Sequence, residues 1–308
     1  MLLLRNWNAV CAPIEAWIRF WIIRSGFQGG LIVSQNKTVF LKHTKRPKQL
    51  KGRMMPKTPN YFKGKTIVIT GAGSGIGKAT AVIFGREGAN VVCADIDEQN
   101  AIAVARETED AGGLATGIYV DVTKRDSVQA MIAKSVDTYG QVDFLFNSAG
   151  SAIKRAKFLE IDDDLWDRTY DLNVKGTLYA MQESIPHMLE RGQGVIVNVA
   201  SMAARMGGPG KSPHYASAKG AVDTLTMGAA REFAGQGIRV LSISPAIVDT
   251  PFQDINEPGM LEEAITRNPM GRAGRPEEIG ELVLFMCSDA CEFMTADTVK
   301  VSGGSGWK

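Results

Sequence analysis

The sequence predicts an α/β fold: a single domain built on a doubly wound parallel sheet. From residue 65 onward, short apolar runs alternate with longer segments of helical composition, which is typical of strand–helix–strand units. The first apolar run, Thr66–Thr70, leads directly into a glycine-rich turn and then a helix. A later apolar run is followed by Ser201, and then by Tyr215 and Lys219 four residues apart. Ligands bind at the carboxyl ends of such strands, so these residues mark one candidate site.

The composition separates the start of the chain from the rest. The 308 residues are 44% hydrophobic and 22% charged, which is ordinary for a globular protein, and the formal net charge is +2. Residues 1–53 hold ten Lys or Arg and one acid, Glu15, whereas the remainder holds 25 basic and 32 acidic residues. This mildly acidic body argues against a nucleic-acid partner. The four cysteines form no metal motif, and Cys287 and Cys291 are expected to be reduced, buried packing residues of a cytoplasmic protein.

Residues 1–60 form a basic extension with three open interpretations: an amphipathic membrane-surface or transit segment, a disordered tail, or an upstream start codon with translation from Met54 or Met55. Its apolar stretches are shorter than the about 20 residues that span a bilayer. The basic, proline-containing run 42–59 is typical of disorder. The start-codon interpretation is favoured, because basic, acid-poor stretches can mimic targeting peptides by chance. The catalytic domain is expected at residues 61–308.

A chain that starts at Met55 is therefore expected to fold and to keep full activity, because every motif lies beyond that point. Yield of soluble protein and kcat/KM, each compared with the full chain, measure this. Loss of either would mean that the extension is structural.

The other elements follow in chain order. Helical composition follows the glycine turn, and residues 250–275 form a Gly- and Pro-punctuated stretch that suggests a lid. Pro186 predicts a kink or an early end of its helix, and Asn173 is expected between two helices. The expected strands are 66–70, 90–94, 114–120, 142–146, 195–199, 238–243 and 298–301, and the expected helices are 78–86, 97–111, one from 124, 162–172, 174–191, the one carrying Tyr215, and 276–287.

The glycine-rich turn predicts a dinucleotide site. Gly71, Gly75 and Gly77 allow the backbone to turn tightly and approach a pyrophosphate, whose charge the following helix N-terminus meets. Asp95 ends the next strand, about 20 residues on, where an acid holds a ribose hydroxyl and repels the extra phosphate of NADP. Ser74 and Ile96 stand where a basic residue would accept that phosphate, and both are uncharged. NAD is therefore favoured over NADP.

The Tyr215–Lys219 pair predicts acid/base chemistry. Residues four apart lie on one face of a helix, so the ammonium can sit near the phenol and favour its charged form. Such pairs are also common on helix surfaces, so the interpretation depends on the glycine turn and on Ser201. The small residues of this helix, from Ala216 to Ala229, predict close packing against another helix, such as that of a second subunit.

Together these residues resemble the short-chain dehydrogenase/reductase family, over about residues 61–306. The matching motifs are Thr-Gly-x-x-x-Gly-x-Gly at 70–77, Asn-x-Ala-Gly at 147–150, Asn173, and Ser201 with Tyr215-x-x-x-Lys219. The resemblance implies a Rossmann-type domain with seven parallel strands and a catalytic tetrad of Asn173, Ser201, Tyr215 and Lys219. It also implies a cofactor site made of Gly71, Ser74, Gly75, Ile76, Gly77, Asp95, Ile96, Asp121, Val122, Asn147, Ala149, Gly150, Tyr215, Lys219, Pro245, Val248 and Thr250.

Several of these residues have narrower implied roles or alternatives. Asp121 and Val122 would approach the adenine, although Asp121 also fits as a helix cap. Asn147 would stabilise the central strands, and Val248 and Thr250 would contact the nicotinamide amide. The chain departs from the family pattern at positions outside the tetrad: Ser148, Ala246, Ala296 and Ser302.

The resemblance implies an oxidoreductase for secondary alcohols or ketones, assembled as a homotetramer or homodimer and similar to 3-oxoacyl-reductase-like and polyol-dehydrogenase-like members. The alternatives are an NADPH-dependent 3-oxoacyl-thioester reductase and a non-catalytic NAD-binding sensor or scaffold. The substrate is left open, and His214 is expected on the surface. Side chains that could make an apolar pocket are Met202, Met206, Phe252, Met260 and Met270, and those that could recruit an anion are Lys154, Arg155, Lys157 and Arg205.

Overall fold

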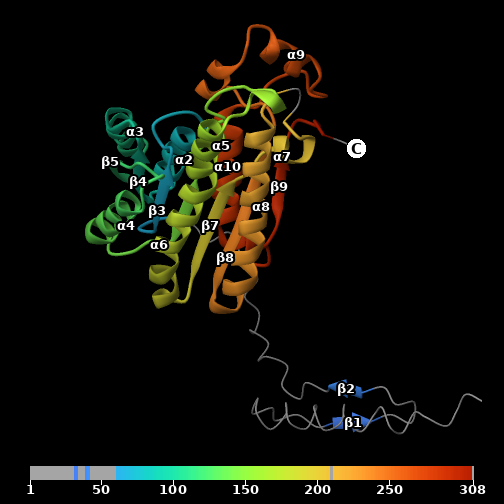
Figure 1. Cartoon of the computed structure of the whole chain (residues 1–308). Helices are drawn as coiled ribbons and strands as arrows, with labels where there is room; N and C mark the ends of the chain where they lie inside the picture. Colours follow the sequence, from blue (N-terminus) through green and yellow to red (C-terminus); the bar gives the residue numbers. More distant parts are fainter. Residues whose placement is uncertain (1–30, 34–38, 42–59, 209–210, 307–308) are drawn as a thin grey trace, which may run out of the picture. The chain divides into compact units, whose positions relative to one another are not determined.

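The computed structural model describes residues 31–33, 39–41, 60–208 and 211–306 (Figure 1). The chain divides into two compact units, 1–54 and 55–308, which are described separately. In the first unit, β1 (Leu31–Val33) pairs antiparallel with β2 (Val39–Leu41). The other predictions made for the extension lie outside the described residues.

The second unit is built on a seven-stranded, all-parallel sheet, as predicted. Its strand order is β5-β4-β3-β6-β7-β8-β9, so the chain winds outward from β3 to one edge and then from β6 to the other. The strands are β3 (Thr66–Thr70), β4 (Asn90–Asp95), β5 (Leu114–Tyr119), β6 (Phe144–Asn147), β7 (Gly194–Val199), β8 (Ile238–Pro245) and β9 (Thr298–Val301). This topology leaves a crevice where the winding reverses, between β3 and β6.

Helices cover both faces of the sheet. In Figure 1, α6 and α8 lie in front of the strands and α10 behind them. The helices of this unit are α2 (Gly75–Arg86), α3 (Glu98–Asp110), α4 (Arg125–Tyr139), α5 (Asp163–Tyr170), α6 (Gly176–Arg191), α7 (Met202–Met206), α8 (Pro213–Phe233), α9 (Met260–Thr266) and α10 (Pro276–Cys287). None of the helices in the described part of the chain is long and apolar enough to cross a membrane.

Two apolar cores result from the alternation of side chains along the strands. Ile67 and Ile69 pack with Phe84 of α2 and Val283 of α10 in one core. Val68, between them, belongs to the opposite core, which includes side chains of α4 and α6. Because both faces are covered, the central strands are apolar throughout rather than alternating. Cys93, Cys287 and Cys291 are free and buried, as predicted for the last two.

Asn173 lies between two helices, as expected, although the chain is not interrupted there. Instead, α5 continues through a π-helical turn, Asp171–Lys175, directly into α6. A π turn inserts one residue into a helix without ending it, and such turns are frequent at functional sites. At Pro186, where a kink or an early end was expected, α6 does not end but continues to Arg191, which is the bound that was predicted for this helix.

Candidate functional site

A cradle of backbone groups lies between the end of β3 and the start of α2. Gly71 and Gly75 have φ values of +68° and +52°, a region that disfavours L side chains. A Cβ on Gly71 would lie 2.7 Å from the Ala149 nitrogen, and one on Gly77 would lie 2.1 Å from the Gly71 oxygen. Ser74 is the N-cap of α2 but makes no side-chain cap hydrogen bond. The glycines therefore fit a close approach to a phosphate at the helix N-terminus.

The carboxylate of Asp95 lies next to this cradle. One of its oxygens accepts a hydrogen bond from the Gly73 nitrogen at 2.8 Å, and the other accepts from the Asp97 nitrogen at 3.0 Å. These bonds fix the acid at the end of β4, where it lines the same cavity as Gly71 and Ser74. Ile96, beside it, is 66% exposed and carries no charge. The arrangement fits a dinucleotide whose ribose hydroxyls face a carboxylate.

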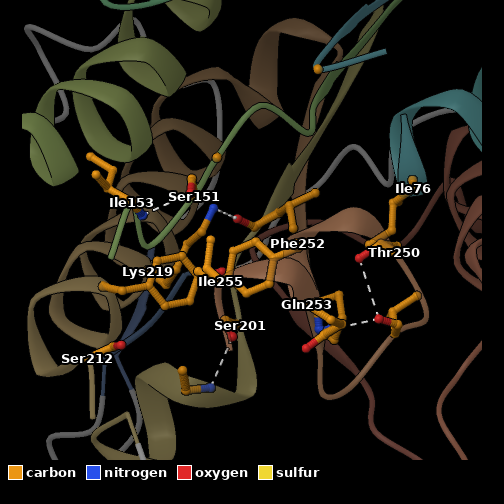
Figure 2. A pocket seen from close by; sticks show the side chains of 18 of the residues that line it. Ile76, Ser151, Ile153, Ser201, Ser212, Lys219, Thr250, Phe252, Gln253 and Ile255 are labelled. Carbon is orange, nitrogen blue, oxygen red and sulfur yellow. Dashed lines mark hydrogen bonds between the residues drawn. The ribbon is translucent and has the colours of Figure 1, made fainter. Parts of the chain in front are cut away.

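A cavity of about 1090 Å³ connects these groups with the predicted catalytic residues. It is large enough for a dinucleotide with a small substrate, since ligand pockets are commonly about 300–1,000 Å³. The predicted residues that line it are Gly71, Ser74, Gly75, Ile76, Asp95, Ile96, Asp121, Val122, Ala149, Gly150, Ser201, Tyr215, Lys219, Pro245, Val248 and Thr250. Gly77, Asn147 and Asn173 do not line it. Figure 2 shows Ser201, Lys219 and Phe252 around this pocket.

Asn147 and Asn173 instead lie behind the wall. The Asn147 amide donates to Asn198 Oδ1 at 2.8 Å, which links β6 to β7. Asn173 sits in the π turn, and its Nδ2 donates to the carbonyls of Ser151 and Thr169. Its Oδ1 is buried without a hydrogen-bond partner among the described residues. A buried amide oxygen without a partner costs stability and calls for an explanation, such as a bound water.

Gly150 makes room for two of the predicted catalytic groups. A Cβ at this position would lie 2.7 Å from Asn173 Oδ1 and 2.9 Å from Lys219 Nζ. The Asn-x-Ala-Gly turn after β6 therefore carries glycine because the amide and the ammonium approach its backbone from the same side. The structure thus brings Asn173 and Lys219 together through Gly150.

The tyrosine and the lysine lie on one face of α8, as their spacing predicts. Lys219 Nζ is 5.7 Å from the centroid of the Tyr215 ring and donates to the Val199 carbonyl at 2.8 Å. Ser201 is the N-cap of the short helix α7, where its hydroxyl accepts from the Ala203 nitrogen at 3.1 Å. Ser201 also hydrogen-bonds Tyr215. The serine, the phenol and the ammonium therefore converge at the carboxyl ends of β7 and β8.

Burial shifts the pKa of both Tyr215 and Lys219 from the ordinary values of these side chains. It raises the pKa of the Tyr215 phenol to about 12, and a hydrogen bond with Ser201 and the charge of Arg155 oppose this rise. Burial also lowers the pKa of the Lys219 ammonium to about 8, which the charge of Asp223 opposes. We expected Lys219 to lower the pKa of Tyr215. The groups that lower it here are Ser201 and Arg155, because Nζ is turned to a backbone carbonyl.

Loops after β5 and β8 complete the wall. Asp121 does not cap α4, whose N-cap is Lys124; its carboxylate accepts from the nitrogen and hydroxyl of Thr123 instead. Thr250 follows β8, and a Cβ on Gly75 would lie 3.1 Å from its methyl group. The segment after β8 therefore closes against the phosphate cradle. Residues 250–267 of the predicted lid contribute a 3₁₀ helix, Pro251–Ile255, and α9 to the wall.

The structure separates the candidates for substrate contacts. Met202, Met206, Phe252 and Met260 line the cavity, whereas Met270 is 61% exposed and does not. Of the four candidate anion-recruiting residues, Arg155 lines the cavity, and Lys154, Lys157 and Arg205 are exposed residues outside it.

His214 was misplaced by sequence reasoning. It is fully buried, and its Nε2 lies 3.1 Å from the Ala152 carbonyl. Its position next to Tyr215 turns it toward the loop after β6, which packs on α8. The position of His214 along the helix does not indicate that this loop covers it, so its burial could not be predicted from the sequence.

Comparisons with known proteins agree with this geometry. A family model described as "Enoyl-(Acyl carrier protein) reductase" matches residues 71–306. The chain is 36% identical over 243 residues to 3-oxoacyl-[acyl-carrier-protein] reductase FabG of Thermotoga maritima, covering 79% of this chain and 98% of that relative. It is 37% identical over 243 residues to cis-4-hydroxycyclohexanecarboxylate dehydrogenase of Sinomonas cyclohexanicum, covering 79% and 97%.

A solved structure is also similar. The crystal structure of 3-ketoacyl-(acyl-carrier-protein) reductase from Brucella melitensis complexed with NADH matches with a TM-score of 0.74 and 32% identity, over 80% of this chain and all of that one. The glycine turn from Gly71 to Gly77, Asp95 at the end of β4 and the tyrosine–lysine pair all lie within residues 71–306, which the family model matches.

Proposed function

Because the chain belongs to the short-chain dehydrogenase/reductase family, we propose that it transfers a hydride between NAD(H) and a secondary alcohol or ketone. One observation carries the proposal: Ser201, Tyr215 and Lys219 line the same cavity as the phosphate cradle and Asp95. The residues that line this cavity fit a nicotinamide cofactor, and the family is one of oxidoreductases. The choice of NAD, the substrate class and the roles of individual residues are proposals.

The roles follow from the chemistry of each side chain. When bound, the nicotinamide supplies the acceptor or donor of the hydride. In alcohol oxidation, Tyr215 Oη takes the hydroxyl proton as the carbinol carbon loses its hydride, and in reduction it gives that proton back. Ser201 Oγ hydrogen-bonds the substrate oxygen as negative charge develops on it. Lys219 is assigned to the cofactor ribose, and its support of the phenolate is proposed for the cofactor-bound state, since Ser201 and Arg155 are the groups that lower the pKa of Tyr215 in the free protein.

We assign Asn173 to the path by which the proton moves from Tyr215 to solvent. Its buried Oδ1 faces the space between Gly150 and Lys219 and has no partner among the described residues. A water there would accept from Lys219 and donate to this oxygen, which would connect Tyr215 through the ammonium to solvent. Asn173 therefore orders the relay rather than contacting the substrate, in line with its place behind the cavity wall.

Two other functions are kept as alternatives. Reduction of a 3-oxoacyl thioester is supported by the names of two relatives. One of them was solved with NADH, so the NAD preference expected from Asp95 does not argue against this activity. A non-catalytic NAD sensor is the alternative outside enzymes. A panel of alcohols, ketones and one 3-oxoacyl thioester, each with NAD(H) and NADP(H), separates the three. No turnover of any substrate with either cofactor would leave only the sensor.

The cofactor preference has its own test. Parent protein is expected to favour NAD over NADP in kcat/KM, because Asp95 would face the 2′-phosphate of NADP. The Asp95→Ala, Ile96→Arg double variant should shift the preference toward NADP. It removes the carboxylate that repels the 2′-phosphate and adds a guanidinium that can bind it through two hydrogen bonds. The ratio of kcat/KM for the two cofactors measures this, with Ile96→Ala as the matched control. A parent that favours NADP would refute the assignment.

Assembly and location are also proposed. The small-residue face of α8 supports a homodimer or homotetramer; a Cβ on Gly228 would meet nothing within 4 Å, so this part of the helix is open. Free, buried cysteines support a cytoplasmic protein.

A further inference from the structure

Arg155 is a pocket-lining cation whose partners are all neutral. Its Nε and Nη2 donate to Asn256 Oδ1 at 2.9 and 2.7 Å, and its Nη1 lies 3.4 Å from the Ser212 hydroxyl. The guanidinium also lies 5.5 Å from the centroid of the Phe252 ring. A guanidinium has five N–H donors, so one on each terminal nitrogen has no partner among the described residues. These two N–H groups are available to an acceptor such as a carboxylate, which arginine commonly binds through two hydrogen bonds.

The charge of Arg155 is not balanced by the chain. No carboxylate of the described residues lies within the 4.0 Å ion-pair distance of its nitrogens; burial lowers its pKa, and the Tyr215 phenol, rather than a carboxylate, opposes the shift. An arginine stays protonated regardless, so the cation remains partly desolvated. Three other cations on the same wall have carboxylate partners, Arg168 with Asp164, Lys211 with Glu257, and Arg267 with Glu263. Among the described residues, Lys124 and Lys219 share the lack of such a partner with Arg155, and Lys219 already belongs to the proposed catalytic group.

Arg155 also lies close to the proposed reacting group. Its charge is one of the two influences that lower the pKa of Tyr215. The Phe252 ring packs on Tyr215, with centroids 5.5 Å apart, and on the guanidinium. A small substrate whose hydroxyl reaches Tyr215 therefore has its far end within reach of Arg155.

The backbone around Arg155 is strained. Ile153, two residues earlier, has φ +61°, and Ser212, which contacts the guanidinium, has φ +99°. Positive φ is unfavourable at a non-glycine residue, most of all at a β-branched one, and persists where the surroundings demand it. Both segments that position Arg155 carry such a residue.

We propose that Arg155 binds a carboxylate of the substrate, so that the enzyme acts on hydroxy or oxo acids in preference to neutral alcohols and ketones. This rests on the proposed oxidoreductase function. It adds a substrate class to that function and a specificity-determining residue to its site.

The rival role for Arg155 is purely structural. Asn256 lies between the 3₁₀ helix Pro251–Ile255 and α9, so the Arg155–Asn256 contact also fastens this segment to the loop after β6. A fastening role predicts that loss of Arg155 slows all substrates alike. A carboxylate-binding role predicts that it slows acids alone.

The test uses substrate pairs that differ only in charge. The probes are 3-hydroxybutyrate, cis- and trans-4-hydroxycyclohexanecarboxylate and 4-(1-hydroxyethyl)benzoate, each with its carboxamide, assayed for kcat/KM with NAD. Parent protein should favour at least one acid over its amide by about tenfold or more. Arg155→Met should lower that ratio about 10–100-fold, mainly through KM, and Arg155→Lys should keep part of it, because lysine retains the charge but not the guanidinium.

Two matched variants separate the explanations. Asn256→Ala removes the fastening contact but keeps the guanidinium, and should leave the acid-to-amide ratio unchanged. Lys211→Met removes a neighbouring pocket cation that has an acidic partner, and should also leave the ratio unchanged. Competitive inhibition by cyclohexanecarboxylate, compared with cyclohexanecarboxamide, gives the same comparison on the parent alone if a variant fails to fold.

The outcomes are distinct. Acids preferred by the parent, with the preference lost in Arg155→Met, support the proposal. Turnover of amides as fast as acids by the parent, or equal loss for both in Arg155→Met, overturns it and leaves the oxidoreductase function standing. No turnover of any probe, or of the wider alcohol and ketone panel, overturns the function itself.

Discussion

The Tyr215→Phe protein is expected to lose about 10²–10⁴-fold in kcat while binding NADH as tightly as the parent. The change removes the hydroxyl that exchanges a proton with the substrate and little volume. Single-turnover kinetics and a fluorescence titration with NADH measure the two quantities. Ser201→Ala is the matched control, because it removes the hydrogen bond to the phenol but leaves the proton-transferring group.

The proposed role of Tyr215 also predicts the direction in which the reaction rates change with pH. Burial holds the pKa of Tyr215 near 12, so the phenol is protonated at neutral pH in the free protein. Alcohol oxidation needs the phenolate and should speed up as the pH rises, whereas ketone reduction needs the proton and should speed up as the pH falls. Residual activity of Tyr215→Phe should lack this dependence. If the variant keeps more than about a tenth of parent activity on a good substrate, the phenol is not the general acid/base.

The parts of the fold that could be predicted are those that local chemistry determines. The strand Thr66–Thr70 and the helix Pro276–Cys287 have the bounds that apolar runs and an N-terminal proline indicate. The glycine turn was identifiable because a pyrophosphate-binding turn needs residues without side chains, and Gly77 leaves no room for one. Where one residue type meets a steric or electrostatic demand, the sequence alone is informative.

The parts that could not be predicted depend on contacts between distant segments. Asn173 was expected between two helices, but only the fold shows that it lies in a π turn and that its amide reaches Ser151, 22 residues away in the chain. His214 reads as a surface residue, yet the loop after β6 covers it. Arg155 reads as one of four similar basic residues, and only its neutral partners in the fold set it apart.

At Ala296 the sequence shows a departure from the family pattern but not its structural consequence. The family pattern has glycine there, and the structure explains why, because Ala296 has φ +59°. Its nitrogen donates to the Val240 carbonyl at 2.9 Å, so the segment before β9 is fixed in this conformation despite the side chain. The sequence shows the departure from the pattern, but the backbone demand appears only in the fold.

The Lys219→Met protein is expected to lose activity and gain stability. The ammonium is assigned both to the ribose and to the phenolate, so kcat should fall about 10²–10⁴-fold and the Kd for NADH should rise. The cofactor-free protein should nevertheless unfold at a temperature at least about 2 °C higher, because methionine removes a buried cation. The lost hydrogen bond to the Val199 carbonyl costs about 1.5–3 kcal/mol because its donor is charged, which is less than the several kcal/mol that burying an unpaired ion costs.

The sign of this stability difference can be checked against pH. Burial lowers the pKa of Lys219 to about 8 in the folded protein, below the 10.5 of an unperturbed lysine, so the folded state disfavours the charged form. That penalty is fully present below pH 8 and fades as the pH rises from about 8 toward 10, where the parent folds with the amine neutral. The gap in melting temperature between variant and parent should therefore be largest near pH 7 and shrink above pH 8.

Lys211→Met is the matched control for this experiment, since it removes a lysine that has an acidic partner, Glu257, and is less buried. It should show no gain in melting temperature and no pH-dependent gap. If Lys219→Met melts below the parent at pH 7, the buried ammonium stabilises the cofactor-free protein. Its burial would then have a structural rather than a catalytic reason. If the variant instead melts higher but keeps parent turnover, the buried cation takes no part in the reaction, and the assignment of Lys219 to the phenolate and the ribose fails.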